Sequence, residues 1–196
     1  PDTLYVGKAP LGARAHLFMT PNGGTTWIDV TGTLPDRYPM DIAVDPQNSR
    51  VVYAAFGGAA TGHIFKSVDA GHAWSDITGT LPDIPATAVF VDPAHSNVVF
   101  AGNDIGVYVS TNAGVSWNAF SDGLPDAVLI ADLSLSSSNR VLRATTHGNG
   151  VYQRDMPGAA ASLALTSPNG GEEWAATSAH LITWSTSFVS TVKLEY

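Results

Sequence analysis

The 196-residue chain contains no cysteine. This absence excludes disulfide staples and thiolate metal ligands, and it fits either a reducing cytosol or a bacterial exported protein that does without disulfides. Charged residues are also scarce at 13%, whereas the apolar share of 44% is ordinary. Since charge is about half the usual quarter of a globular sequence, the composition predicts a packed protein and not an acidic disordered chain.

Long apolar runs and basic clusters are missing as well. No apolar stretch approaches the roughly 20 residues of a membrane-spanning helix, and no basic, apolar leader accompanies Pro1, so we expect neither a membrane segment nor a signal peptide in this sequence. The net charge is −8, from nine Lys plus Arg against seventeen Asp plus Glu, with no local basic stripe. Nucleic acid and membranes are therefore not expected as partners.

An internal repeat organises the first 156 residues. The pattern [ST]-x-[DN]-x-G-x-x-W, called the box below, occurs at 20–27 (TPNGGTTW), 67–74 (SVDAGHAW) and 110–117 (STNAGVSW). Each box is followed by an LPD phrase, which reads TGTLPD, TGTLPD and DGLPD. A third shared phrase comes next, and it reads AVDPQNSRVVYAAF, FVDPAHSNVVFAGN and, degraded, LSLSSSNRVLRATT. Three matches in the same order predict a repeat protein.

Short β-rich runs, bounded by Gly, Pro, Asn and Asp, lie between these phrases and predict strands. They are 3–6, 16–19, 51–56, 64–66, 98–101, 107–109, 141–144 and 151–153, and no convincing helix precedes Pro157. A unit of about 45 residues with four strands is the size of a propeller blade. We therefore expect an all-β fold, a partial β-propeller of about three to four four-stranded blades. Two blades would be complete, at 37–78 and 84–121, with one incomplete before them and one lacking its last strand after.

Each residue type in the box has a physical role in the turn, which explains why the same pattern occurs three times in the chain. An Asp or Asn oxygen accepts hydrogen bonds from turn amides, a Gly adopts a conformation that other residues resist, and the Trp covers the turn. Two of the three boxes carry Asn, which keeps the acceptor and discards the charge that a metal would need. We therefore expect a structural role, and no metal or cofactor, for the twelve box residues Thr20, Asn22, Gly24, Trp27, Ser67, Asp69, Gly71, Trp74, Ser110, Asn112, Gly114 and Trp117.

On these boxes, residues 1 to about 156 resemble the Asp-box, or BNR-repeat, β-propellers. That group includes sialidases, xyloglucanase-type glycoside hydrolases, sortilin-type receptors, photosystem assembly factors and many secreted bacterial proteins. The phrase THGNGVYQ at 146–153 also resembles the end of the last blade in such proteins. The resemblance implies the fold and leaves the function open.

The composition changes after residue 156. A small-residue linker at 157–162 (PGAAAS) is followed by a segment at 163–196 that holds all three Glu of the chain and three alternating stretches, at 163–165, 181–183 and 192–194. SPNGGEEW followed by ITW resembles the opening of an immunoglobulin-like module of secreted bacterial enzymes. Because such a sandwich needs about 100 residues, we expect only its N-terminal part here. Trp174 and Trp184 are expected inside that module, with exposed sugar stacking as the alternative.

The propeller also looks incomplete, since six to eight blades need roughly 270 to 360 residues. Open flanks of the first and last blades would expose apolar surface. We expect the remaining blades of a parent protein, another copy, or closure into an unusually small ring to cover them.

Catalysis by paired carboxylates would have to use Asp, because the propeller segment has no Glu. Most of its Asp sit at positions that repeat, which is typical of turns. Among the singular Asp41, Asp104, Asp122, Asp132 and Asp155, two align at the start of the inner strand, where side chains approach the central channel. Asp41 and Asp132 are thus the candidate acid and base, and an inverting pair would stand about 6.5–9.5 Å apart.

Other chemistries find less support. The six Arg fall mainly at strand ends and turns, which disfavours the arginine cluster of a sialidase. The six His lack metal-ligand spacing, and neither a serine nucleophile elbow nor a phosphate loop is present.

Two functions follow from the sequence. The first is a non-catalytic scaffold of a secreted or cell-surface bacterial protein that binds protein or polysaccharide. The alternative is part of a glycoside hydrolase, xyloglucanase-like or sialidase-like. A photosystem-type assembly factor is a third class, which the appended module disfavours. An open cleft with aromatics and two converging Asp would favour the hydrolase.

Overall fold

The computed structural model describes residues 2–157, 162–168, 170–175 and 177–187. The chain divides into two compact units, Pro1–Arg154 and Asp155–Tyr196. The described residues form strands and turns without a helix. Accordingly, this part of the chain has no helix with the length and apolarity to cross a membrane.

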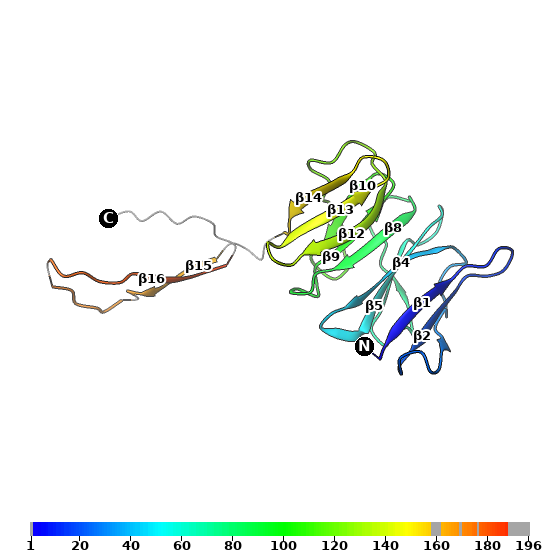
Figure 1. The fold of residues 1–196 in the computed structure, drawn as a ribbon, viewed down its shortest axis with the longest axis horizontal. Coiled ribbons are helices and arrows are strands. Elements are labelled where there is room, and N and C mark those ends of the chain that lie inside the picture. Colours follow the sequence, from blue (N-terminus) through cyan, green and yellow to red (C-terminus); the bar gives the residue numbers. More distant parts are fainter. Residues whose placement is uncertain (1, 158–161, 169, 176, 188–196) are drawn as a thin grey trace. The chain divides into compact units, whose positions relative to one another are not determined.

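Four antiparallel sheets follow one another along the first unit, and we call them the first to fourth blades (Figure 1). The first blade is β1 (Leu4–Lys8), β2 (His16–Thr20) and β3 (Ile28–Asp29). The second is β4 (Pro39–Asp45), β5 (Asn48–Phe56), β6 (Ile64–Ser67) and β7 (Ser75–Asp76). The third is β8 (Ala86–Val91), β9 (Val99–Asn103), β10 (Gly106–Ser110) and β11 (Asn118–Ala119), and the fourth is β12 (Ile130–Ser136), β13 (Val141–Thr146) and β14 (Val151–Asp155).

The blades are arranged so that their first strands are neighbours, since β8 packs against both β4 and β12. This confirms the expected all-β fold with blades that follow one another around an axis. All eight runs that predicted strands are strands. In the part of the chain that the structure describes, the first blade has no inner strand before β1 and the fourth has no strand after β14.

The box turns are held by side chains that accept from the backbone. The Oδ1 atom of Asp69 accepts the Ala73 amide at 2.9 Å and the Ser67 hydroxyl at 2.7 Å, while Ser67 Oγ accepts the Gly71 amide at 2.8 Å. The same bonds recur in the boxes around Asn22 and Asn112. The box glycines have left-handed φ angles of 96°, 89° and 94°. Because an amide oxygen replaces the carboxylate without loss of a bond, the turn uses geometry and not charge.

The box tryptophans also join neighbouring blades. Trp74 Nε1 donates to the Val30 carbonyl of the first blade at 2.7 Å, and Trp117 Nε1 donates to the Ile77 carbonyl of the second at 2.8 Å. Trp117 is buried, at 5% exposure, in the apolar cluster between the second and third blades. The expectation that the Trp covers its own turn is therefore incomplete, because Trp27, which has no preceding blade among the described residues, is 44% exposed.

The second unit contains one antiparallel pair, β15 (Ser162–Ser167) with β16 (Thr183–Ser187). The Trp174 ring stacks on His180 with centroids 4.3 Å apart, and both Trp174 and Trp184 are exposed. The third stretch expected here, at 192–194, lies outside the described residues. The immunoglobulin-like module therefore stays a prediction.

Candidate functional site

A groove of about 610 Å³ opens beside the first and second blades. This volume is within the roughly 300–1,000 Å³ of small-molecule sites. Its walls come from the loop between β1 and β2, from the segment that links β3 to β4, and from Gly58 after β5. We call the propeller face that carries these loops the linker face. The groove is lined by Ala9, Pro10, Gly12, Ala13, Arg14, Ala15, Asp36, Arg37, Tyr38 and Gly58.

Side-chain bonds fix the loop wall against the linker. Arg14 Nη2 donates to the carbonyls of Gly32 at 3.2 Å and Leu34 at 3.0 Å. Asp36 Oδ1 accepts the Ala15 amide at 3.0 Å. These bonds hold the end of the loop that leads into β2, at Arg14 and Ala15, against the segment that links β3 to β4.

The other wall is built by Arg37, Tyr38 and Gly58. The Arg37 side chain runs across Gly58, where an added Cβ would come within 2.7 Å of its Cδ. Gly58 also has a φ of +96°, which other residues resist. Tyr38 is 57% exposed, while its carbonyl accepts the Gly57 amide at 2.9 Å. The groove is thus lined by an exposed aromatic residue and by the arginine that precedes it in the chain.

The charge of the groove differs in sign from that of the chain. Two arginines and one aspartate line it, although the chain carries a net charge of −8. Guanidinium donors suit hydroxyl, carboxylate and carbonyl oxygens. The groove therefore favours a polar or anionic ligand with an apolar face for Tyr38.

Asp41, one of the two candidate catalytic residues, lies near the start of β4 on the same side of the molecule as the linkers. A β-bulge at Met40 interrupts the pairing between Pro39 and Asp41. Asp41 Oδ1 accepts the Ile42 amide at 2.7 Å and Oδ2 accepts the Val89 amide of the third blade at 2.9 Å. Burial raises the pKa of Asp41, both amides oppose this effect, and the charge of Asp132 raises the pKa further.

Asp132 occupies the equivalent position on β12, directly after a bulge of the same kind. It is exposed, whereas Ala88 stands at this position on the intervening β8. The charge of Asp132 raises the pKa of Asp41 across the intervening blade, and it is the weakest of the influences on this pKa named above. The two carboxylates differ in kind: one is engaged by backbone amides and the other faces solvent.

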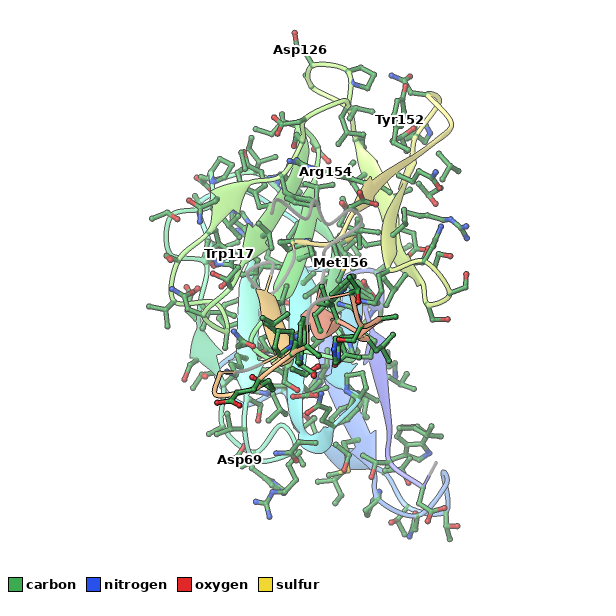
Figure 2. All side chains as sticks on the ribbon, turned by 90° about the vertical axis from the view of Figure 1, so that its left-hand side faces the viewer. Asp69, Trp117, Asp126, Tyr152, Arg154 and Met156 are labelled. Atoms are coloured by element: carbon green, nitrogen blue, oxygen red, sulfur yellow. The ribbon has the colours of Figure 1, made fainter. Side chains whose placement is uncertain are left out.

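The repeated aspartates serve loops and turns. Asp83 accepts hydrogen bonds from the Ala60 amide and from His63 Nε2, just as Asp36 accepts one from the Ala15 amide. The third LPD aspartate, Asp126, is exposed at a loop tip (Figure 2). Asp36 and Asp83 each bond to a long loop of their blade, whereas the third blade has only a short turn between β9 and β10. Among the described residues, no three His, Asp or Glu side chains gather in a way that could hold a metal ion.

The groove is the feature that sequence reasoning missed. Arg37 and Tyr38 follow an LPD phrase directly and break the repeat, because the equivalent positions after Asp83 hold Ile84 and Pro85. That difference between repeats was the available signal. A second signal was the length of the loop at 9–15, because the corresponding connection in the third blade, between β9 and β10, is only a tight turn.

No protein-family model and no curated protein matches the chain, but solved structures do. A GH74 enzyme of Niastella koreensis matches 79% of this chain over 27% of its own length, with 20% identity and a TM-score of 0.63. The GH74 xyloglucanase from Xanthomonas campestris matches 78% of this chain over 27% of its length, with 18% identity and a TM-score of 0.59.

A third structure, YCF48 bound to a D1 peptide, matches 80% of this chain over 56% of its length, with 15% identity and a TM-score of 0.54. This chain therefore spans about a quarter of the length of the GH74 enzymes and about half of YCF48. At such identities the likeness concerns architecture, and it supports the conclusion that residues 2–154 form part of a β-propeller.

Proposed function

We propose that the propeller unit is a non-catalytic scaffold of a secreted or cell-surface bacterial protein, and that it binds a polysaccharide in the linker-face groove. The exposed residue Tyr38, in a groove that Arg14 and Arg37 also line, carries this proposal. A sugar ring has an apolar face that stacks on an aromatic ring and hydroxyl groups that accept from such donors. A protein ligand offers fewer flat apolar faces of that size, so polysaccharide is favoured.

The state of Asp41 favours binding over catalysis. A general acid or base must reach the substrate within about 3 Å, directly or through one water. Both carboxylate oxygens of Asp41 already accept backbone amides, one of them from the next blade. Moving this carboxylate toward a substrate would break a contact between blades.

Binding can be tested by affinity electrophoresis and calorimetry with the 196-residue chain against xyloglucan, a neutral mannan and a uronate-containing pectin. We expect Tyr38→Ala to weaken the binding of the preferred polymer about tenfold, which corresponds to about 1.4 kcal/mol. Trp27→Ala, an exposed aromatic on the first blade outside the groove, is the matched control and should leave affinity unchanged. Equal binding by both variants, or no binding to any polymer, would reject the proposal.

Part of a glycoside hydrolase is the second candidate. It is favoured by the likeness to GH74 enzymes and by the raised pKa of Asp41, to which Asp132 contributes. This candidate predicts release of reducing ends from xyloglucan, with activity lost in both Asp41→Asn and Asp132→Asn. Binding without any release of reducing ends would leave the scaffold as the function of this chain.

The finer assignments from the sequence belong to the same proposal. We assign the boxes at 20–27, 67–74 and 110–117 to the Asp-box type, with the propeller at 1–156, a linker at 157–162 and an immunoglobulin-like part at 163–196. An exported bacterial protein in which a propeller precedes such a module would present the groove to polymers outside the cell.

A further inference from the structure

The contact between adjacent blades has a constant polar element. The indole N–H of Trp74 reaches the carbonyl of Val30, and that of Trp117 reaches the carbonyl of Ile77. Each acceptor stands three residues after the box Trp of the preceding blade. Because the acceptor is a backbone group, any blade that ends in the same turn supplies it.

The first blade has the tryptophan of this contact, but no carbonyl of a preceding blade accepts its indole N–H among the described residues. Trp27 is the box Trp of this blade, and among the described residues its Nε1 has no hydrogen-bond partner. The ring is 44% exposed, and with Val6 and Phe18 it lines an apolar hollow of about 260 Å³. The counterparts of the 45%-exposed Val6 are Ala54 and Ala101, which are buried by the blades before them. We call Val6, Phe18 and Trp27 the open face.

The same blade also has an unpaired strand edge. In the second and third blades, β5 and β9 each pair with an inner strand, β4 or β8. Their counterpart β1 pairs with β2 on one side, and the described part of the chain offers no strand for its other side. The open face and the open edge therefore lie on the same blade.

We propose that the open face seats a further four-stranded blade of the same repeat, carried by the same polypeptide. This blade is joined to Thr3 through an inner strand that pairs with β1. In the repeat, one continuous path runs from a box through an LPD linker and an inner strand to the second strand. A single segment on that path fills the open face and the open edge together.

A second copy of the chain fits this face less well. Its last described blade has no strand in the fourth place, so it lacks a carbonyl equivalent to those of Val30 and Ile77. It would also leave the edge of β1 unpaired. The hydrogen-bond pattern thus favours a covalently joined blade.

The test extends the chain with its own repeat. A copy of residues 37–97 is placed directly before Thr3. This copy contains the second blade, the LPD segment after it, and the inner strand β8 with the turn that follows. The junction keeps the register of the repeat because Val98 and Thr3 are equivalent positions. The measurement is hydrogen exchange of the assigned indole N–H groups by NMR. We expect exchange at Trp27 to slow at least tenfold on extension, while Trp74 and Trp117 stay protected in both chains.

Two further variants make the test decisive. Trp27→Leu should barely change the unfolding midpoint of the original chain but lower that of the extended chain, whereas Trp117→Leu should lower both. A second extended chain with Val6→Ala matches the Ala54 and Ala101 of the buried interfaces, in case Val6 is too large.

Fast exchange at Trp27 in both extended chains would overturn the proposal. So would loss of protection at Trp74 and Trp117 in both, because a blade that seats correctly leaves the other interfaces intact. Protection of Trp27 in the original chain that rises with protein concentration would assign the face to a second copy instead.

Discussion

At Asp92, a buried carboxylate joins the third and fourth blades. Its two oxygens accept from Arg140 Nη1 at 3.0 Å and Nη2 at 2.7 Å, while Ala94 donates its amide at 2.9 Å. Asp45, the same residue of the preceding blade, accepts the Ser96 hydroxyl at 2.8 Å. The DP phrase thus places one aspartate per turn, and its partner on the next blade decides whether the contact is ionic.

Asp92→Asn should destabilise the protein by about 2–3 kcal/mol at neutral pH, because it leaves Arg140 without its bidentate acceptor. Burial acts to raise the pKa of Asp92, but Arg140, the Ala94 amide and His95 outweigh it and lower the pKa below 3.8. A lowered pKa means that the stabilisation is complete above about pH 4 and is lost as the pH falls toward the folded-state value.

Urea unfolding at pH 7, 5, 4 and 3 would measure this effect. The difference between the original protein and Asp92→Asn should be constant from pH 7 to 5 and should shrink at pH 3. Adding Arg140→Met to the Asn variant should restore part of the loss. A difference that does not depend on pH would show that the carboxylate charge contributes nothing.

At the scale of strands, each contact between blades includes a pair of facing residues, one from the second strand of a blade and one from the inner strand of the next. The sizes of the two residues in a pair compensate for each other. Gly7 lies against Pro39 and Gly102 against Ile130, and an added Cβ would come within 2.8 Å and 2.6 Å of them, respectively. At the same position of the second blade, Ala55 shares its buried cluster with Ala86. A glycine therefore stands where the next blade brings a large residue.

Gly102→Ala should destabilise the protein by about 1–3 kcal/mol through overpacking, and Ile130→Ala by about 2–4 kcal/mol through a cavity. The double variant recreates the pair of alanines found between the second and third blades. It should lose at least about 1 kcal/mol less than the sum of the single variants. A double-mutant cycle by urea unfolding measures this coupling, and simple additivity would contradict the facing-pair explanation.

At the contact between the third and fourth blades, an arginine takes the place of the tryptophan that the two earlier contacts use. Arg154 on β14 (Figure 2) stands at the position of Ser67 and Ser110, and its guanidinium carbon lies 4.0 Å from the centre of the Phe120 ring. Its Nη2 donates to Asp122 at 2.9 Å, where the earlier repeats have Gly32 and Gly79 against a Trp ring. An arginine–aspartate pair thus occupies the space of indole and glycine.

Much of this fold follows from sequence periodicity, and much of the site does not. Each box specifies its own turn through bonds within eight residues, so Ser67, Asp69 and Gly71 were readable in isolation. The exposure of Trp27 depends on a neighbouring blade, and the groove around Tyr38 depends on a loop from another part of the repeat. Local patterns carry no information about such long-range contacts, and for this reason Arg154 and the groove were missed.

For the whole molecule, stability is expected to reside in contacts between successive blades. Two buried clusters, one around Leu17 and Phe56 and one around Val99 and Trp117, each draw on adjacent blades. All their members belong to the unit that ends at Arg154. The second unit presents a two-stranded pair, which is marginally stable at best in water.

A chain ending at Pro157 should therefore keep the unfolding midpoint of the full 196 residues within about 2 °C, since 1 kcal/mol shifts a domain of this size by roughly 2–4 °C. Ending the chain at Ala127 removes β12–β14, exposes the face of the third blade and leaves Asp92 without Arg140, so its midpoint should fall well beyond that range. Thermal unfolding followed by circular dichroism compares the three chains. A large drop on removal of residues 158–196 alone would show that the propeller depends on the second unit, because every contact named above would then be insufficient to hold the blades.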